Sequence, residues 1–187
     1  APSAAVAGLN QAGMSMKPQV NAQSLLNGCL YPFEGLSPEQ GYPSMADFIV
    51  ESGHSAKGRG VMALRHFQRI TRMCRVSGQL VHAPQLHSVQ LAAGIHVYDP
   101  YFCGRLRHSC DPNVFLDMSE LWLWALQDIT PGSPLCMDYV STEASLLRQF
   151  ACECGSPRCR GWITGYDEQP STEGWLFLQR WHRHGLC

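Results

Sequence analysis

The chain has 187 residues, of which 45% are hydrophobic, and its formal net charge is −1 at pH 7. This length predicts a single domain with an arm, and the near-zero charge gives no direct signal for nucleic-acid binding. No apolar run reaches the length of about 18 residues that a membrane-spanning helix needs, so no membrane partner is predicted.

Residues 1–45 are rich in Ala, Gln, Asn, Ser, Gly and Pro and carry few charges. They show no sustained hydrophobic period, which predicts an N-terminal arm or linker. The pattern then changes, and residues 47–51 and 59–64 predict two short strands that flank a Gly-Ser-Lys turn. Further short strands are predicted at 70–76, 79–82, 88–92 and 95–98, with a hairpin turn at Ala93-Gly94 between the last two.

Two more strands are predicted at residues 114–117 and 121–126, on either side of a Met-Ser-Glu turn. The second of these runs is continuously apolar, so we expect both of its faces to be buried. Together with the preceding segments, this pattern indicates a mainly β fold.

Helix is predicted at only two places. The first begins at a cap near residue 141 and runs to Phe150. The second begins near residue 171 and runs to about residue 182, with Trp175, Leu178 and Trp181 expected on one side. The fold class is therefore mainly β with short helices.

Nine cysteines are many for a chain of this length, and they raise the possibility of a disulfide framework. Their odd number and the C-x-C spacing near the C-terminus favour metal ligation in a reducing compartment instead. We therefore predict an intracellular protein, cytoplasmic or nuclear, and keep the disulfide framework as the alternative.

Three of these cysteines, Cys152, Cys154 and Cys159, follow a C-x-C-x4-C spacing, and a glycine and a proline between them allow the chain to curl. Three thiols cannot complete a four-coordinate metal shell, but Cys110 can supply the fourth ligand. A closed set of four cysteine thiolates is typical of structural zinc. The alternative interpretation is that these are buried or free thiols, because cysteine is often only a small core residue.

Several segments carry a family resemblance. Residues 107–114 read Arg-His-Ser-Cys-Asp-Pro-Asn-Val, and residues 125–132 read Ala-Leu-Gln-Asp-Ile-Thr-Pro-Gly. Leu-Cys-Met-Asp-Tyr follows at 135–139, and Lys-Gly-Arg-Gly-Val-Met-Ala precedes them at 57–63. With the cysteine tail at 152–159, these five segments, in this order, resemble the SET-domain protein lysine methyltransferases that carry a post-SET zinc motif.

The resemblance implies a domain organisation and a fold. Residues 1–45 would be the N-terminal arm and residues 46–149 the SET-like domain. Residues 150–187 would form the post-SET zinc segment and a C-terminal helix. The implied fold is the SET β fold, with a knot-like crossing of two chain segments and a C-terminal zinc site shared with Cys110.

The resemblance also implies an activity, the transfer of a methyl group from S-adenosylmethionine to a lysine of a protein or peptide. Tyr139 would be catalytic, at the point where the donor and the lysine amine meet. The amine must be neutral to react, and desolvation in an apolar channel lowers the cost of removing its proton. The residues implied for donor binding are Gly58, Arg59, Gly60, Arg107 and His108.

The match also has gaps. Arg107 stands where the family has an asparagine that contacts the donor. Residues 75–79 lack the family's aromatic residue, and the insert that reads a peptide substrate is short or missing around 83–95. These departures leave two alternatives open: a SET scaffold that binds or acts on a small molecule, and an inactive interaction module. Fold resemblance alone does not decide between them.

Overall fold

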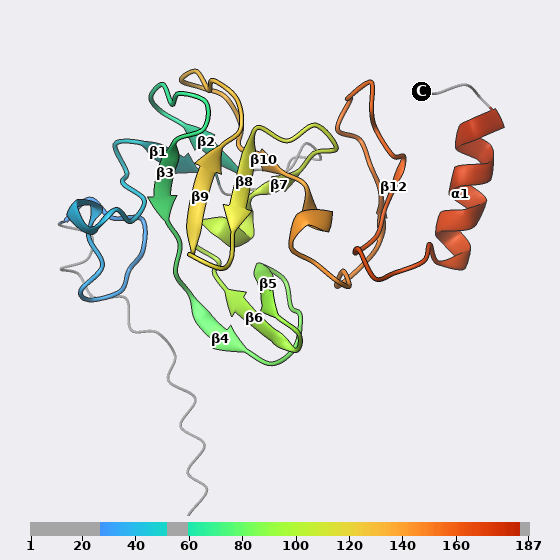
Figure 1. Cartoon of the computed structure of the whole chain (residues 1–187), viewed down its shortest axis with the longest axis horizontal. Coiled ribbons are helices and arrows are strands. Elements are labelled where there is room, and N and C mark those ends of the chain that lie inside the picture. Colours follow the sequence, from blue (N-terminus) through green and yellow to red (C-terminus); the bar gives the residue numbers. More distant parts are fainter. Residues whose placement is uncertain (1–26, 52–59, 184–187) are drawn as a thin grey trace, which may run out of the picture.

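The structure is a computed structural model, and it describes residues 27–51 and 60–183. The described chain is built mainly from short strands that form five small sheets, with one α-helix near the C-terminus (Figure 1). The strands are β1 (Phe48–Val50), β2 (Val61–Ala63), β3 (Arg72–Arg75), β4 (Gln79–Val81), β5 (Ser88–Ala92), β6 (Ile95–Tyr98), β7 (Arg107–His108), β8 (Val114–Asp117), β9 (Trp122–Ala125), β10 (Cys136–Met137), β11 (Phe150–Ala151) and β12 (Trp162–Ile163).

The helical elements are α1 (Thr172–Arg183) and three single-turn 3-10 helices, η1 (Pro38–Gln40), η2 (Cys103–Arg105) and η3 (Tyr139–Ser141). Within the described ranges, no helix has both the length and the apolar character required to cross a membrane. The mainly β class predicted from the sequence is therefore confirmed, and most of the predicted strands lie within a residue or two of the observed ones.

The strands from β1 to β9, apart from β7, form three antiparallel units. Strands β1 and β2 pair with Phe48 opposite Ala63, as the two strand-like runs predicted. The turn predicted between them, like Gly58 and Arg59, lies outside the described residues. The other two units are three-stranded sheets with the orders β3-β9-β8 and β4-β6-β5, and the predicted hairpin turn joins β5 to β6 through Gly94, whose φ is 71°.

Only one face of β9 is fully buried, so the expectation that both faces would be covered was wrong. Leu123 and Ala125 are sealed in the core, whereas Trp122 and Trp124 are half-exposed. The guanidinium of Arg72 lies 5.0 Å from the Trp122 ring centroid and 5.2 Å from that of Trp124. Indole rings tolerate partial exposure because the ring face attracts the arginine cation and the ring N–H can be solvated.

The central feature of the fold is a parallel pair of strands from distant parts of the chain. Strand β10 pairs with β7, with Cys136 opposite Arg107 and Met137 opposite His108. The two strands lie side by side in the middle of the molecule (Figure 1). This pairing brings the segment that contains His108 against the segment that ends in Tyr139, so both reach one site.

A buried carboxylate, that of Asp99, fixes the chain segment that leads into β7. Asp99 is 0% exposed, and its oxygens accept hydrogen bonds from the backbone N–H groups of residues 101–103 at 2.6 to 3.0 Å. The Tyr31 hydroxyl donates a further bond to Asp99 at 2.8 Å. Tyr31 and Cys29 are themselves in the core, so residues from the N-terminal segment pack against the centre of the fold.

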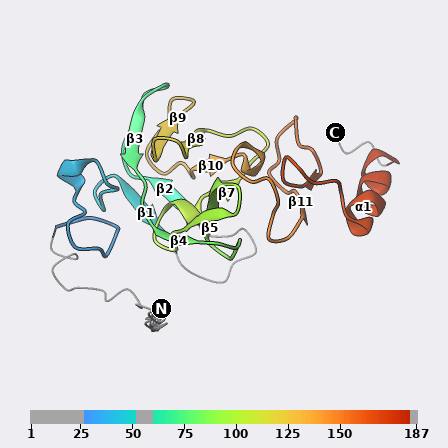
Figure 2. The ribbon, with the colours of Figure 1, turned by 60° about the horizontal axis from the view of Figure 1, so that its bottom comes forward.

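The C-terminal segment extends to one end of the molecule, where α1 lies beyond β11 and β12 in both views (Figure 2). Helix α1 is confirmed, and of the three residues predicted on one side of it, Leu178 and Trp181 are partly buried while Trp175 is exposed. Gly174 is buried against the Trp162 indole, and a side chain there would collide with that ring. Phe177 and Trp181 lie on the same side as Gly174, three and seven residues on, whereas Trp175 is 52% exposed.

The helix predicted from residue 141 to Phe150 was wrong. Only the single turn η3 forms, and residues 142–149 are turns and bends that lead into β11. The reason is that side chains outside the segment accept hydrogen bonds from backbone N–H groups that a helix would use internally. The backbone N–H of Ala144 donates to the Gln90 side chain at 2.9 Å, and that of Leu146 donates to Glu168 at 3.1 Å. Tertiary contacts here override local helix propensity.

Candidate metal centre and adjoining pocket

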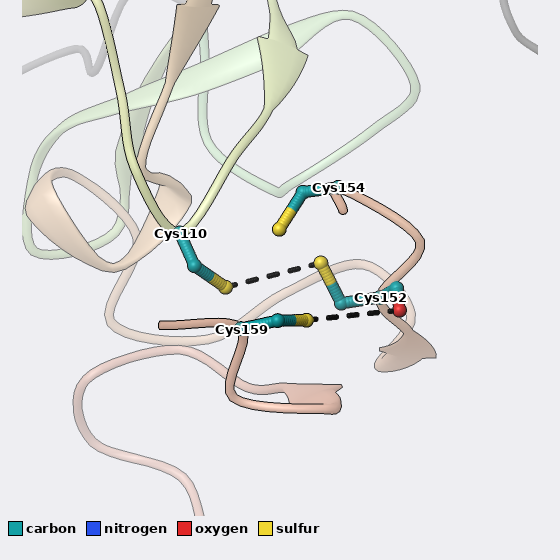
Figure 3. A group of neighbouring side chains, drawn as sticks. All are labelled: Cys110, Cys152, Cys154 and Cys159. Atoms are coloured by element: carbon teal, nitrogen blue, oxygen red, sulfur yellow. Dashed lines mark hydrogen bonds between the residues drawn. The ribbon is translucent and has the colours of Figure 1, made fainter. Parts of the chain in front are cut away.

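Four cysteines lie together as the sequence predicted: Cys110, Cys152, Cys154 and Cys159. Their Sγ atoms all lie within 4.8 Å of one another, and those of Cys110 and Cys152 are 3.8 Å apart. Figure 3 shows the sulfur atoms turned toward one another, with Cys110 on the loop after β7 and the others on the C-terminal segment. A tetrahedral ion with bonds of about 2.3 Å to sulfur requires sulfur–sulfur distances near 3.8 Å, so the donor set fits zinc.

Backbone groups also support negative charge on these sulfurs. The N–H of Arg160 points at Cys110 Sγ and that of Gly161 at Cys159 Sγ, each at 3.4 Å. Burial by itself raises the pKa of Cys154, but hydrogen bonds from the Cys110 and Ser156 backbones and from neighbouring thiols lower it to about 6. Metal ligation requires thiolates. Four cysteines leave no open coordination position, so such a metal would be structural.

No disulfide forms among the eight cysteines within the described residues, and the ninth, Cys187, lies outside them. Cys29, Cys74 and Cys103 are buried core residues, and burial raises their pKa values. These three thiols therefore behave as small apolar side chains. None of them belongs to the four-cysteine cluster.

His108 connects the cysteine cluster to Tyr139. Its side chain is 3% exposed, its Nδ1 accepts the backbone N–H of Tyr139 at 3.3 Å, and its Nε2 lies 3.4 Å from Cys110 Sγ. An accepting Nδ1 places the proton on Nε2, which then donates toward the sulfur. Burial and the nearby Arg160 charge lower the pKa of His108 to about 4 against the opposing effect of Asp138, so the ring is neutral.

Three rings form the wall behind this connection. His108 and Tyr139 are 5.2 Å apart between centroids, His108 and Phe150 are 5.7 Å apart, and Tyr139 and Phe150 are 6.1 Å apart. All three pairs meet edge to face, the geometry that aromatic rings prefer. Phe150 begins the C-terminal segment, so the position of Tyr139 depends on the segment that carries the cysteines. The sequence did not identify Phe150 as a site residue.

The Tyr139 hydroxyl donates a hydrogen bond to the Leu106 carbonyl at 2.8 Å. Burial raises the pKa of Tyr139 to about 12, and the nearby Cys136 and Glu143 act in the same direction. The phenol is therefore neutral at physiological pH. A neutral phenol fixed by one hydrogen bond can orient a polar group without bringing a charge into the pocket.

Tyr139 lines a pocket with a volume of about 300 Å³. Arg107, Leu106 and Glu143 share this pocket, and Leu146, Leu147 and Phe150 supply much of its apolar wall. The structure thus brings Tyr139 and Arg107, both selected from the sequence, to one cavity. His108 lies behind it, between Tyr139 and the cysteine cluster. Glu143 was missed, although it follows Tyr139 by four residues.

Arg107 lies against Gly60, the one residue of the Gly58-Arg59-Gly60 motif within the described ranges. A Cβ at Gly60 would come within 2.7 Å of Arg107 Cγ and 2.9 Å of its Cδ. A side chain at this position would therefore require the Arg107 stem to move. No carboxylate of residues 27–51 or 60–183 forms an ion pair with Arg107, and this arginine lines the pocket.

Arg160 and Asp138 connect the C-terminal segment to the residue before Tyr139. Two guanidinium nitrogens of Arg160 lie 2.6 and 2.7 Å from the two Asp138 oxygens. Burial raises the pKa of Asp138, but the hydrogen bonds and the charge of Arg160 outweigh that effect, so the pKa is lower than usual. Asp138 Oδ1 also accepts the backbone N–H of Val140 at 3.2 Å and so caps η3. Bidentate pairs of this kind fix orientation as well as adding stability.

We expect Arg160→Gln to lower the free energy of unfolding by about 1 kcal/mol, because the Arg160 side chain is 42% exposed and solvent screens part of the pair. Urea denaturation at pH 7 measures this. Arg158→Gln is the matched control, because Arg158 pairs with Asp111 but is 78% exposed, and its removal should change stability less. Equal losses in the two variants would contradict the structural role assigned to Arg160.

The chain matches known proteins only in part, and no family model matches it. The chain is 32% identical over 90 residues to the methyltransferase flvH of Aspergillus flavus, covering 46% of this chain and 49% of that protein. It is 31% identical over 83 residues to the H3 lysine-9 specific histone-lysine N-methyltransferase of Schizosaccharomyces pombe, covering 31% of this chain and 16% of that protein. The chain thus spans half or less of the length of these curated relatives.

Among solved structures, the chain resembles KRYPTONITE in its complex with mCHG DNA and SAH. The TM-score is 0.50 and the sequence identity 24%, and the match covers 62% of this chain and 29% of that one. At this level of identity the likeness concerns the fold. It agrees with the mainly β architecture and the four-cysteine cluster near the C-terminus. The fold of this chain is that of the SET-domain proteins.

Proposed function

We propose that this chain is an S-adenosylmethionine-dependent methyltransferase whose acceptor is a lysine amine of a protein or peptide. The observation that carries the proposal is the Tyr139 phenol, neutral and hydrogen-bonded, in a pocket shared with Arg107. The two curated relatives named above are both methyltransferases by name, and one acts on a histone lysine. The solved complex of KRYPTONITE contains SAH.

Lysine presents a protonation problem to any such enzyme. At pH 7 its unperturbed pKa of about 10.4 makes the neutral amine cost roughly 4 to 5 kcal/mol. The apolar side chains of Leu106, Leu146 and Phe150 line the pocket and desolvate whatever enters it, which favours the neutral form. The Tyr139 hydroxyl and the Leu106 carbonyl are polar groups able to orient the amine. Positioning of the two reactants supplies much of the remaining rate.

When bound, the donor supplies an electrophilic methyl group on a sulfonium. Among the residues proposed to hold it, Arg107 offers a guanidinium that suits the carboxylate at its amino-acid end. Gly60 lies under the arginine stem, and the backbone of Gly58 and Arg59 is proposed to complete the site. We assign zinc, held by the four cysteines, a structural role: it fixes the C-terminal segment beside His108 and Tyr139. A site of four thiolates also suits a reducing, intracellular compartment.

Arg107→Asn tests the donor site. If Arg107 pairs with the donor's carboxylate or turns outward, the variant should bind S-adenosylmethionine within about tenfold of the wild type, a change of roughly 1.4 kcal/mol. Isothermal titration calorimetry measures both proteins, and transfer of a labelled methyl group to lysine peptides reports activity. The matched control is Arg105→Gln, because Arg105 lines the same pocket but is held by the Pro100 carbonyl at 2.8 Å.

Absence of measurable donor binding by the wild type would overturn the proposed function. Donor binding gained by Arg107→Asn alone would then indicate that the arginine closes the donor site, as expected of a scaffold used for another ligand. Tight donor binding with methyl transfer to lysine would support the proposal directly.

A further inference from the structure

A further pocket, separate from the one that contains Tyr139, lies between the N-terminal segment at residues 33–36 and the paired strands β4 and β6. Its volume is about 450 Å³, and the two pockets have no lining residue in common. Gln79 and Tyr98 stand opposite each other in the register of β4 and β6, and both line this pocket. Whatever binds there is therefore bound by residues other than those proposed for methyl transfer.

Aromatic rings form two walls of this pocket at nearly a right angle. The ring centroids of Phe33 and Tyr101 are 5.5 Å apart, and the angle between the ring planes is 87°. Tyr98 supplies a third ring to the lining. Burial raises the pKa of Tyr101, and the nearby Tyr98 and Asp99 act in the same direction, so the Tyr101 phenol is neutral at physiological pH. Perpendicular rings at one corner can present an electron-rich face to whatever enters.

The core beneath the pocket holds these walls in place. Phe33 stacks on the buried Tyr31, with ring centroids 6.0 Å apart and an angle of 23° between the planes. The backbone N–H of Tyr101 donates to the buried Asp99 carboxylate at 2.9 Å, and the Tyr31 hydroxyl donates to the same carboxylate at 2.8 Å. Both rings are thus positioned before a ligand arrives, and such preorganisation lowers the entropy lost on binding.

The charges beside this pocket are negative. Glu34 is exposed and lines the pocket, and no ion pair with a cation forms at Glu34 in the described part of the chain. Asp99 lies behind Tyr101. No lysine or arginine of the described ranges lines the pocket. Arg105 donates to the Pro100 carbonyl at 2.8 Å, but its side chain lines the other pocket. Charge complementarity therefore favours a cationic ligand.

We propose that this pocket binds a methylated ammonium group, such as that of trimethyl-lysine or of choline. Aromatic faces attract cations of this kind, and the carbon atoms of Leu36 and Pro100 in the lining suit methyl groups. An unmethylated ammonium is strongly hydrated, and aromatic rings return few hydrogen bonds for the water it would lose. The inference goes beyond the proposed function and does not depend on it.

The chemistry of the ligand makes this a binding site and not a second site of methyl transfer. A trimethylated nitrogen has no lone pair, so it cannot accept a methyl group, and it has no N–H that would be left unpaired. Its positive charge is spread over the methyl groups, which can lie against the ring faces while Glu34 remains in water. The recognition thus rests on the rings, with the carboxylate adding a weaker attraction that solvent screens.

The test titrates four probes into the full chain and follows binding by NMR. Nα-acetyl-Nε-trimethyl-lysine N-methylamide is compared with its neutral isostere, in which carbon replaces the quaternary nitrogen, with its unmethylated counterpart and with choline. The variants are Tyr101→Leu, which removes a ring but keeps apolar bulk, and Glu34→Gln. The matched controls are Tyr166→Leu and Glu39→Gln, because both residues are exposed and neither lines this pocket. Melting temperatures check that every variant folds.

We expect the wild type and both controls to bind the trimethyl-lysine probe at least about tenfold more tightly than the neutral isostere. They should also bind it more tightly than unmethylated lysine. Tyr101→Leu should lose the preference for charge, and Glu34→Gln should weaken binding of the charged probes by about threefold. Equal binding of the two isosteres by the wild type, or a preference that survives in Tyr101→Leu, overturns the inference, as does equal binding of methylated and unmethylated lysine.

The choline arm distinguishes the two sources of such a group. Choline binding as tight as that of trimethyl-lysine would support the site and assign it to small quaternary amines. Tighter binding of the lysine probe would support the site and assign it to a methylated protein or peptide. Failure of the proposed function leaves these outcomes unchanged, because no titration contains the methyl donor.

Discussion

Cys154→Ser is expected to remove the bound zinc and to disorder the chain from about residue 150 onward. The wild type should contain one zinc per chain, held by four thiolates whose sulfurs already lie within 4.8 Å of one another. Metal binding of this kind is folding free energy, with apparent values of about 10 to 16 kcal/mol in zinc-finger peptides at pH 7. Elemental analysis of protein purified without chelator measures the metal, and hydrogen exchange measures the order of the C-terminal segment.

Cys136→Ser is the control for this experiment, because Cys136 is partly exposed and lies outside the four-cysteine cluster. It should retain the full zinc content. Phe150 contacts both His108 and Tyr139, so loss of order after residue 150 should also reduce methyl transfer in the Cys154 variant. Wild-type protein without zinc would show that the cluster is only a group of neighbouring thiols.

Tyr139→Phe should lower turnover by about 100-fold or more, since removal of one well-placed polar group from an active site typically costs a factor of 10² to 10³. Folding should be nearly unaffected. The ring and its edge contacts remain, and only the hydrogen bond to the Leu106 carbonyl is lost, at about 1 kcal/mol. Steady-state methyl transfer and a thermal melt measure the two effects separately.

Tyr98→Phe provides the comparison, because Tyr98 lines a different pocket and should leave turnover close to that of the wild type. The neutral Tyr139 phenol also has a consequence for pH. Its pKa is raised to about 12, so the rate should show no titration of this group between pH 6 and 9. Full turnover in Tyr139→Phe would show that the tyrosine does not have the role proposed here.

Local pattern predicted most of the strands because alternation and turn residues are local properties. The hairpin at Gly94 and the pair β1 and β2 depend on neighbours in sequence, and they are found where expected. The failed helix between residues 141 and 150 shows the limit of this approach. There the competing hydrogen bonds come from Gln90 and Glu168, which are 54 and 22 residues away from the groups they bind.

The residues of the candidate site likewise fall into those that a sequence pattern identifies and those that only the fold brings together. The cysteine cluster could be predicted because four ligands of one type at a known spacing imply a common centre, and the structure brings them together. Glu143 and Phe150 could not be identified, because neither residue belongs to a pattern with a chemical meaning. Their positions depend on the parallel pairing of β7 with β10 and on the way the C-terminal segment returns to Tyr139.

The separation of the cysteines along the chain has a consequence for how the protein matures during synthesis. Cys110 and Cys152 are 42 residues apart. At about 5 to 20 residues per second, a ribosome takes roughly 2 to 8 s to make the stretch between them. Throughout that interval the growing chain has only one of the four cysteines of the cluster, Cys110. The four-cysteine site can therefore be completed only after Cys159 has been made, so we expect metal capture to come late in synthesis and to coincide with the docking of Phe150 against His108 and Tyr139.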